Sequence, residues 1–111
     1  MNPLDLTPSG AEITADGLYR YRLWRLWDLD APGMVWILLN PSTADAAFDD
    51  PTLRKCIGFE RAHHHGGVIL VNLFAWRATN PEVLPKVADP IGSLNDEHIL
   101  WACRAPLLAT V

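Results

Sequence analysis

The stretch Met34-Val35-Trp36-Ile37-Leu38-Leu39 decides the fold class, because it is apolar at every position. A strand that is apolar on both sides is covered on both sides, as in the centre of an α/β sheet. The run ends at Asn40-Pro41, where proline interrupts the ladder of a sheet. A second run of this kind, Val68-Ile69-Leu70-Val71-Asn72-Leu73, follows later in the chain. The sequence therefore predicts two buried central strands.

The segment between these two runs is predicted to be a helix. Asp50 is a favourable N-cap, and Pro51 stands at the first helical position, where proline is favoured. Leu53, Cys56 and Ile57 recur at helical spacing, and Gly66-Gly67 is expected to stop the helix. A strand, helix and strand in this order predict a βαβ crossover, in which the two strands run parallel.

The flanking segments complete the predicted fold. Residues 1–10 are expected to be a frayed N-terminus, and residues 11–111 a single domain. Residues 11–28 are predicted to form a β-hairpin that turns at Asp16-Gly17. Strand alternation would place one set of hairpin side chains on one face (Tyr19, Tyr21 and Leu23) and a second set on the other (Arg20, Arg22 and Trp24).

Towards the C-terminus, a loop is expected over residues 77–89, followed by a helix that Ser93 caps and that ends near Arg104, before Pro106. Residues 107–111 are predicted to open a third parallel strand, and we expect the domain to be C-terminally shortened there. The predicted fold is a three-layer α/β sandwich, with an N-terminal antiparallel hairpin beside a parallel βαβ core.

Composition and charge exclude several classes of protein. The 111 residues (12.4 kDa) are 50% hydrophobic and 20% charged, unlike a disordered, collagen-like or coiled-coil chain. No apolar run approaches the roughly 20 residues of a membrane helix, and no signal peptide is recognised. The formal charge of −4 excludes a polybasic protein, so binding to nucleic acid would need a local cluster of arginines. The oligomeric state stays open.

Two cysteines, Cys56 and Cys103, lie in apolar segments and form no CxxC pair. Buried thiols in a reducing cytoplasm are the simplest interpretation. His63-His64-His65 is interpreted as a solvated helix end, because adjacent helical residues point about 100° apart and three in a row do not close on one ion. No metal and no cofactor are expected. The sequence has no P-loop and no G-x-G-x-x-G, which disfavours ATP hydrolysis and dinucleotide binding, and it has no nucleophile elbow, which disfavours nucleophilic catalysis.

Candidate functional residues follow the two central strands, at the edge of the sheet where open parallel sheets bind ligands. One loop begins at Asn40 and the other at Asn72, and parallel strands would place the two loops side by side. We select as catalytic candidates Asn40, Asp45 and Asp49, and as substrate-binding candidates Ser42, Thr43, Asn72, Phe74, Trp76, Arg77 and Thr79.

Structural roles are alternatives for most of these residues. The asparagines could cap strand ends, Ser42 and Thr43 could be turn residues, and Asp45 and Asp49 could be solvated carboxylates. Asp50 fits a helix cap better than a catalyst. Arg77 is the strongest candidate, because an arginine just beyond a buried strand suits a carboxylate or phosphate ligand.

The two loop motifs resemble those of a family of bacterial and phage proteins, domain of unknown function 1643. The resemblance runs from about Tyr19 to Trp101, and members of that family are usually longer. It rests on three segments: Leu39-Asn40-Pro41-Ser42-Thr43-Ala44-Asp45, Asp50-Pro51-Thr52, and Asn72-Leu73-Phe74 with Arg77-Ala78-Thr79.

A weaker likeness is to the mismatch-specific branch of the uracil-DNA glycosylases. It implies hydrolysis of an N-glycosidic bond in a nucleotide or nucleic acid. By this likeness Asn40 would orient the attacking water, and Arg77-Ala78-Thr79 would lie near the nucleic acid. Asp45 or Asp49 would act as general base, Trp76 or Phe74 would stack on the base, and Arg77 would hold phosphate. The second DNA-gripping loop of that branch has no counterpart here. The alternatives are a non-catalytic module that binds a nucleotide or nucleic acid, and a truncated, non-functional fragment.

Overall fold

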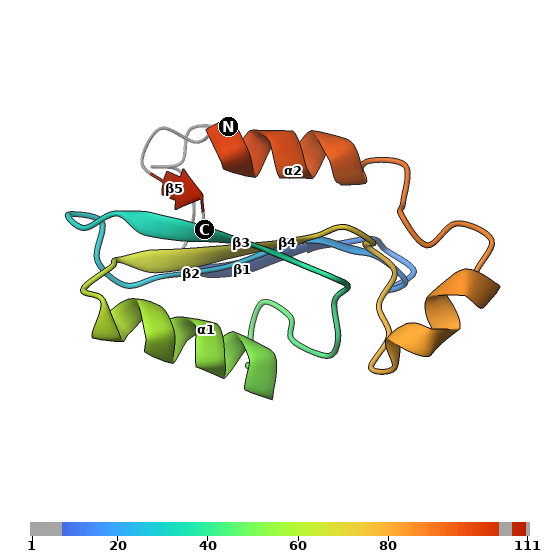
Figure 1. Ribbon diagram of the computed structural model, residues 1–111, viewed down its shortest axis with the longest axis horizontal. Coiled ribbons are helices and arrows are strands. Elements are labelled where there is room, and N and C mark those ends of the chain that lie inside the picture. Colours follow the sequence, from blue (N-terminus) through green and yellow to red (C-terminus); the bar gives the residue numbers. More distant parts are fainter. Residues whose placement is uncertain (1–7, 105–107, 111) are drawn as a thin grey trace.

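In the part of the chain that the structure describes, five strands form one sheet in the order β1-β2-β4-β3-β5, with α1 on one face and α2 on the other (Figure 1). The computed structural model describes residues 8–104 and 108–110. The predicted three-layer α/β fold is confirmed. Its elements are β1 (Ser9–Ile13), β2 (Arg20–Leu26), β3 (Gly33–Leu38), α1 (Pro51–Ala62), β4 (Gly67–Asn72), the 3₁₀ helix η2 (Pro81–Lys86), α2 (Asn95–Arg104) and β5 (Leu108–Thr110).

The parallel core has the predicted arrangement. β3 and β4 are adjacent and parallel, in a register that runs from Gly33 opposite Gly67 to Leu38 opposite Asn72. β5 adds a further parallel strand beside β3, whereas β2 pairs with β4 in the antiparallel sense. Asp50 caps α1 as expected, because its carboxylate accepts a hydrogen bond of 2.9 Å from the Leu53 amide. The chain therefore leaves β3 and β4 at the same edge of the sheet.

Each face of the sheet buries its own hydrophobic cluster. Under α1 the fully buried residues include Leu23, Leu53 and Leu70, and under α2 they include Val35 and Ile69. Burial of each such side chain contributes roughly 1.5–3 kcal/mol, so the two helices are held mainly by these contacts. Within the described residues, neither α-helix combines the length and the apolarity that a membrane crossing would need.

A β-bulge in β2 overturns the predicted orientation of its first residues. Glu12 of β1 pairs with Arg22, whereas Ile13 pairs with Arg20, so Tyr21 is an extra residue on β2. After the bulge, the side chains of Tyr21 and Arg22 lie on the same face of the sheet. Both of them contact α2, through the rings of His98 and Trp101.

Because of the bulge, the side chains of Arg20 and Leu23 lie on the face of the sheet that α1 covers. Arg20 donates a hydrogen bond to the carbonyl of Ala44, in the segment before α1, and Leu23 belongs to the cluster under α1. The prediction that Tyr21 and Leu23 share a face, with Arg20 and Arg22 on the other, is therefore wrong. A strict two-residue alternation cannot anticipate an inserted residue.

Several element boundaries and connections also differ from the predictions. β1 begins at Ser9, so Ser9 and Gly10 belong to the sheet, while residues 1–7 lie outside the described residues. The β1–β2 connection is longer than a two-residue turn, and in it the Asp16 carboxylate accepts from the Leu18 amide at 3.0 Å. Further along, α2 begins at Asn95, later than expected, and η2 forms inside the predicted loop.

The end of α1 is built differently from the expected glycine stop. The helix ends at Ala62, and the residue with a left-handed backbone is His64, with φ of 61°.

Of the cysteines, Cys56 is buried, and burial raises the pKa of its thiol to about 11, helped by the nearby carboxylates of Glu60 and Asp50. Cys103 is exposed, so the prediction of two buried thiols is wrong for that residue.

Candidate functional site

The two loops that follow β3 and β4 lie side by side, as the parallel register requires. The Phe74 amide donates to the Leu39 carbonyl at 3.0 Å, and the Ala78 amide donates to the Pro41 carbonyl at 2.9 Å. These backbone hydrogen bonds continue the β3–β4 pairing beyond the ends of both strands. The polar residues of the two loops are therefore held in one region of the surface.

A hollow of about 220 Å³ lies between these loops and is open to solvent. The turn between β1 and β2 supplies its third side, through Gly17. Of the residues predicted from the sequence, Ser42, Thr43, Arg77 and Thr79 line the hollow. The complete lining is Gly17, Ser42, Thr43, Arg77, Ala78 and Thr79.

Arg77 is held in the hollow by weak hydrogen bonds from its guanidinium to backbone carbonyls. Nε donates to Ser42 at 3.4 Å, Nη1 to Gly17 at 3.3 Å and Nη2 to Thr43 at 3.4 Å. Among residues 8–104, no carboxylate lies within ion-pair distance of this guanidinium. Long hydrogen bonds to neutral acceptors hold an arginine in place without neutralising it, so its charge stays available to an anion.

Other hydrogen-bond donors around the hollow make weak contacts or none. The Ser42 hydroxyl donates to the Thr79 hydroxyl at 3.4 Å, at the limit of a hydrogen bond. In the described part of the chain, the amide groups of Ser42, Thr43 and Thr79 donate to no other residue. Hydroxyls, free amides and a guanidinium are the groups that proteins use to hold phosphate.

Asn40 joins the two loops through its side-chain amide. Nδ2 donates to the Ala78 carbonyl at 2.7 Å and to the Pro41 carbonyl at 3.1 Å. None of the hydrogen bonds among residues 8–104 uses Oδ1, which is also not one of the buried unpaired atoms. The amide is thus fixed by its nitrogen, and its oxygen remains an acceptor open to solvent, next to the hollow at Ala78.

The match to known proteins covers both loops. Residues 20–109 match the family described as protein of unknown function (DUF1643). The chain belongs to this family. No match was found among curated proteins or among solved structures. The predicted relation to the DUF1643 family is confirmed, while the likeness to uracil-DNA glycosylases stays a prediction.

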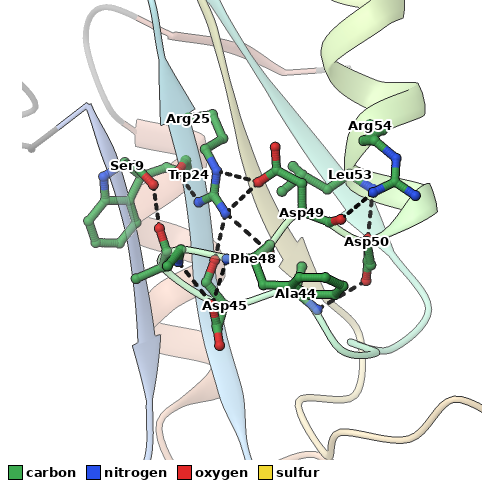
Figure 2. A network of polar contacts seen from close by, with 12 residues as sticks. Ser9, Trp24, Arg25, Ala44, Asp45, Phe48, Asp49, Asp50, Leu53 and Arg54 are labelled. Carbon is green, nitrogen blue, oxygen red and sulfur yellow. Dashed lines mark hydrogen bonds and ion pairs between the residues drawn. The ribbon is translucent and has the colours of Figure 1, made fainter.

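In this DUF1643 domain, a buried arginine fixes the loop that carries Ser42 and Thr43 (Figure 2). Arg25 of β2 donates to the Asp49 carboxylate from Nε at 3.0 Å and from Nη2 at 2.9 Å. The same guanidinium donates to the carbonyls of Trp24 at 2.8 Å and Asp45 at 2.6 Å. The Arg25 side chain, which extends from the sheet, therefore fixes the segment over residues 45–49.

Arg20 holds the adjoining part of the same loop. Its Nη1 donates to the carbonyl of Ala44 at 3.1 Å. Ala44 directly follows Ser42 and Thr43, whose carbonyls accept from Arg77. Burial lowers the pKa of Arg20 to about 10, against the attraction of the Asp50 carboxylate, so the side chain remains charged at neutral pH. Neither Arg20 nor Arg25 was selected from the sequence.

The three loop carboxylates are engaged in holding this loop. Asp49 accepts from Arg25, and Asp50 accepts from the amides of Leu53 and Ala44. Asp45 accepts from the amides of Ala47 and Phe48, and these hydrogen bonds hold the pKa of its carboxyl below 3.8. That stabilisation is present at neutral pH and is lost as the pH falls through the lowered pKa. A carboxylate with a lowered pKa is also a weak general base.

Asn72 is buried at the end of β4 and does not line the hollow. Its Nδ2 and Oδ1 have no hydrogen-bond partner among the described residues, and neither does the buried Oδ1 of Asn95. Asn95, which the sequence did not single out, donates from Nδ2 to the carbonyls of Asn72 at 2.8 Å and Leu73 at 3.2 Å. It thereby fastens the start of α2 to the end of β4.

The two aromatic candidates are also outside the hollow. Trp76 pairs with Tyr19 across an isolated bridge, and the two rings meet edge to face with centroids 5.4 Å apart. Phe74 is half-buried in the turn after β4 and is not part of the lining. The structure thus brings together Ser42, Thr43, Arg77 and Thr79, with Asn40 beside them.

Proposed function

We propose that this hollow binds the phosphate of a free nucleotide. The observation that carries the proposal is the guanidinium of Arg77, which has no carboxylate partner among the described residues and stands among three hydroxyl side chains. A dianionic phosphate would replace the long contacts to neutral carbonyls with short, charge-assisted hydrogen bonds. The free amides of Ser42 and Thr43 provide further donors for the same phosphate.

The distribution of charge favours a free nucleotide over a strand of nucleic acid. The chain has 9 lysines and arginines, and Arg20, Arg22 and Arg25 among them are buried in β2. The surface is therefore poor in the basic side chains that follow a phosphate backbone, and 13 acidic residues oppose such a backbone. A single phosphate needs only the local donors. The resemblance of Asn40-Pro41 and of the Arg77 loop to glycosylases favours a nucleotide among phosphate compounds.

Replacement of Arg77 by alanine is expected to weaken binding of nucleoside 5′-monophosphates about 10- to 100-fold, because a charge-assisted hydrogen bond contributes about 1.5–3 kcal/mol. Calorimetric titration with each of the common monophosphates measures the effect. Lys55→Ala is the control, because it removes the same charge from an exposed position in α1. Equal affinity for nucleosides that lack phosphate, or tighter binding of a short single-stranded oligonucleotide, would contradict the proposal.

Hydrolysis of an N-glycosidic bond is the second candidate function, favoured by the open Oδ1 of Asn40. This oxygen can accept a hydrogen bond from a water molecule and hold it against the sugar. In the reaction, the water oxygen bonds to C1′ of the sugar, and the base leaves with the bonding electrons. One proton of the water remains on the new hydroxyl at C1′, the other passes to solvent, and the departing base takes up one proton from solvent. Because the carboxylates of Asp45, Asp49 and Asp50 already accept hydrogen bonds that hold the loop, this candidate function relies on Asn40 alone to orient the water.

The variant Asn40→Ala separates catalysis from binding. If the chain hydrolyses nucleotides, the variant is expected to release base at a rate lower by about 100-fold or more, while the affinity falls by no more than about tenfold, the part that comes from losing the Nδ2 contacts between the loops. Chromatographic detection of the free base in a timed incubation gives the rate. If the wild-type protein binds nucleoside monophosphates but releases no base from any of them, the hydrolytic function is ruled out and only the binding function remains.

A further inference from the structure

The start of β2 and the segment after β4 form a short antiparallel ladder beside the hollow. Its two backbone hydrogen bonds are donated by the amide of Arg20 at 3.0 Å and by the amide of Arg77 at 2.9 Å, each to a carbonyl of the facing segment. Between them, Tyr19 and Trp76 stand directly opposite each other, and their rings meet on one face of the ladder. Because successive side chains alternate between the two faces, those of Arg20 and Arg77 share the other face.

Arg20 and Arg77 are diagonal neighbours on this face, at the separation of about 7–8 Å that two adjacent strands allow. Both guanidiniums reach the loop after β3, where they contact consecutive carbonyls. Arg77 donates to those of Ser42 and Thr43 at 3.4 Å, and Arg20 donates to that of Ala44 at 3.1 Å. Residues 42–44 of this loop, two of which line the hollow, therefore contact two cations.

Neither cation is neutralised by an ion pair. Within residues 8–104, no carboxylate lies at ion-pair distance from either guanidinium. The Asp50 carboxylate attracts Arg20, but it accepts from the amides of Leu53 and Ala44 at the start of α1. Arg20 is only 2% exposed, and its Nε has no hydrogen-bond partner in the described chain. Two like charges held together without a counter-ion cost free energy, so such a pair is typical of a site for an anion.

The charge of Arg20 persists at neutral pH. Burial lowers its pKa to about 10, and the positive charge of Arg77 acts in the same direction, which agrees with the closeness of the two guanidiniums. A group with this pKa is almost fully protonated in neutral solution, so Arg20 contributes a full positive charge beside that of Arg77.

We propose that Arg20 makes the hollow selective for phosphate monoesters, which carry two negative charges, over phosphate diesters, which carry one. The inference rests on the proposed function, in which Arg77 holds the phosphate. Arg20 does not line the hollow, so it acts through its charge and not by contact with the ligand. At an effective dielectric constant of about 20, an arginine attracts a unit charge about 8 Å away strongly enough to change affinity about tenfold or more. The second negative charge of a monoester therefore tightens binding.

This selectivity distinguishes a free mononucleotide from a strand of nucleic acid. A nucleoside 5′-monophosphate is a monoester whose second ionisation has a pKa near 6, so it is mostly a dianion at neutral pH. The internal phosphates of a strand are diesters with one charge each. Arg20 thus favours the small ligand at the level of a single phosphate, independently of the overall charge of the chain.

Calorimetric titration at about pH 7.5 with each common nucleoside 5′-monophosphate and with its methyl phosphate ester tests this proposal. The wild type should bind the monoester at least about tenfold more tightly than the methyl ester. Arg20→Gln removes the charge but keeps a side-chain N–H donor, and it should lower this ratio at least about fivefold. Arg54→Met is the matched control, because Arg54 is an exposed arginine that donates to the same loop, at the Asp49 carbonyl. Its ratio should stay within about twofold of the wild type, since water screens an exposed charge.

The ratio of the two affinities separates selectivity from a structural role. If Arg20 only shaped the loop, Arg20→Gln would weaken both ligands equally and leave the ratio unchanged, and that result would overturn the proposal. A wild type that binds both ligands within about threefold of each other also overturns it, while the proposed function stands. Binding of neither ligand removes the proposed function and this inference together.

Circular dichroism at the titration temperature verifies the folding of each variant. If Arg20→Gln does not fold, Arg77→Ala decides the outcome, because it keeps Arg20 as the remaining cation of the pair. This variant should still prefer the monoester by at least about threefold. A folded Arg77→Ala protein without any preference would show that Arg77 alone determines the selectivity.

Discussion

The variant Gly66→Ala is expected to lose at least about 3 kcal/mol of its free energy of unfolding. A Cβ atom at this position would lie 1.9 Å from the Asp28 carbonyl oxygen and 2.7 Å from the Ala31 carbonyl oxygen. Both obstacles are backbone atoms, so no side-chain rotation relieves the overlap. The backbone of Gly66 is also fixed, since its amide donates to Pro32 at 2.7 Å and its carbonyl accepts from Trp27 at 2.9 Å.

Gly58 supplies the control for this prediction. It lies on the exposed side of α1, and a Cβ atom there would have no neighbour within 4 Å. Gly58→Ala should therefore stabilise the protein by about 0.5–1 kcal/mol, through the higher helix propensity of alanine. Urea unfolding followed by tryptophan fluorescence measures both variants. A Gly66→Ala protein within 1 kcal/mol of the wild type would show that the β2–β3 connection yields to the methyl group.

The central part of the fold was predictable because its signals are local. Continuous apolar runs mark β3 and β4, and Asp50-Pro51 marks the start of α1. The parallel pairing of the two strands then follows from the crossover between them, and it brings together Ser42, Thr43, Arg77 and Thr79. Each of these inferences uses residues within one element or its immediate neighbours.

The features that were missed depend on contacts between distant segments. Nothing within β2 marks Tyr21 as an extra residue, because the bulge exists only relative to β1. Nor does the sequence around Arg25 indicate that its partner is Asp49, which is 24 positions away. Asn95 looks like an ordinary residue near a helix start until its contact with the carbonyls at the end of β4 is known. Nor does the sequence indicate that the ring of Trp76 meets the ring of Tyr19; the stacking of Trp76 on a base stays a prediction.

The second large effect is expected for Arg25→Met, which removes the guanidinium while retaining much of the aliphatic side chain. The carbonyls of Trp24 and Asp45 would lose their charged donor, and Asp49 would lose its ion pair. Because the Asp49 side chain is 41% exposed, water can solvate its carboxylate again. We therefore expect a loss of about 2–3 kcal/mol, less than for a fully buried ion pair. Urea unfolding measures it.

The same variant also tests whether the loop that Arg25 holds determines the shape of the hollow. Arg25 contacts neither Ser42 nor Thr43, but it fixes the segment that follows them, so its removal should loosen the wall of the hollow. Under conditions where the variant is folded, affinity for a nucleoside monophosphate should fall about tenfold, since displaced donors no longer converge on the phosphate. Arg54→Met is the control. Its exposed guanidinium also donates to the loop, at the Asp49 carbonyl, yet its loss should change stability by less than about 0.5 kcal/mol. Equal effects of the two variants on affinity would mean that the loop holds its shape without the buried arginine.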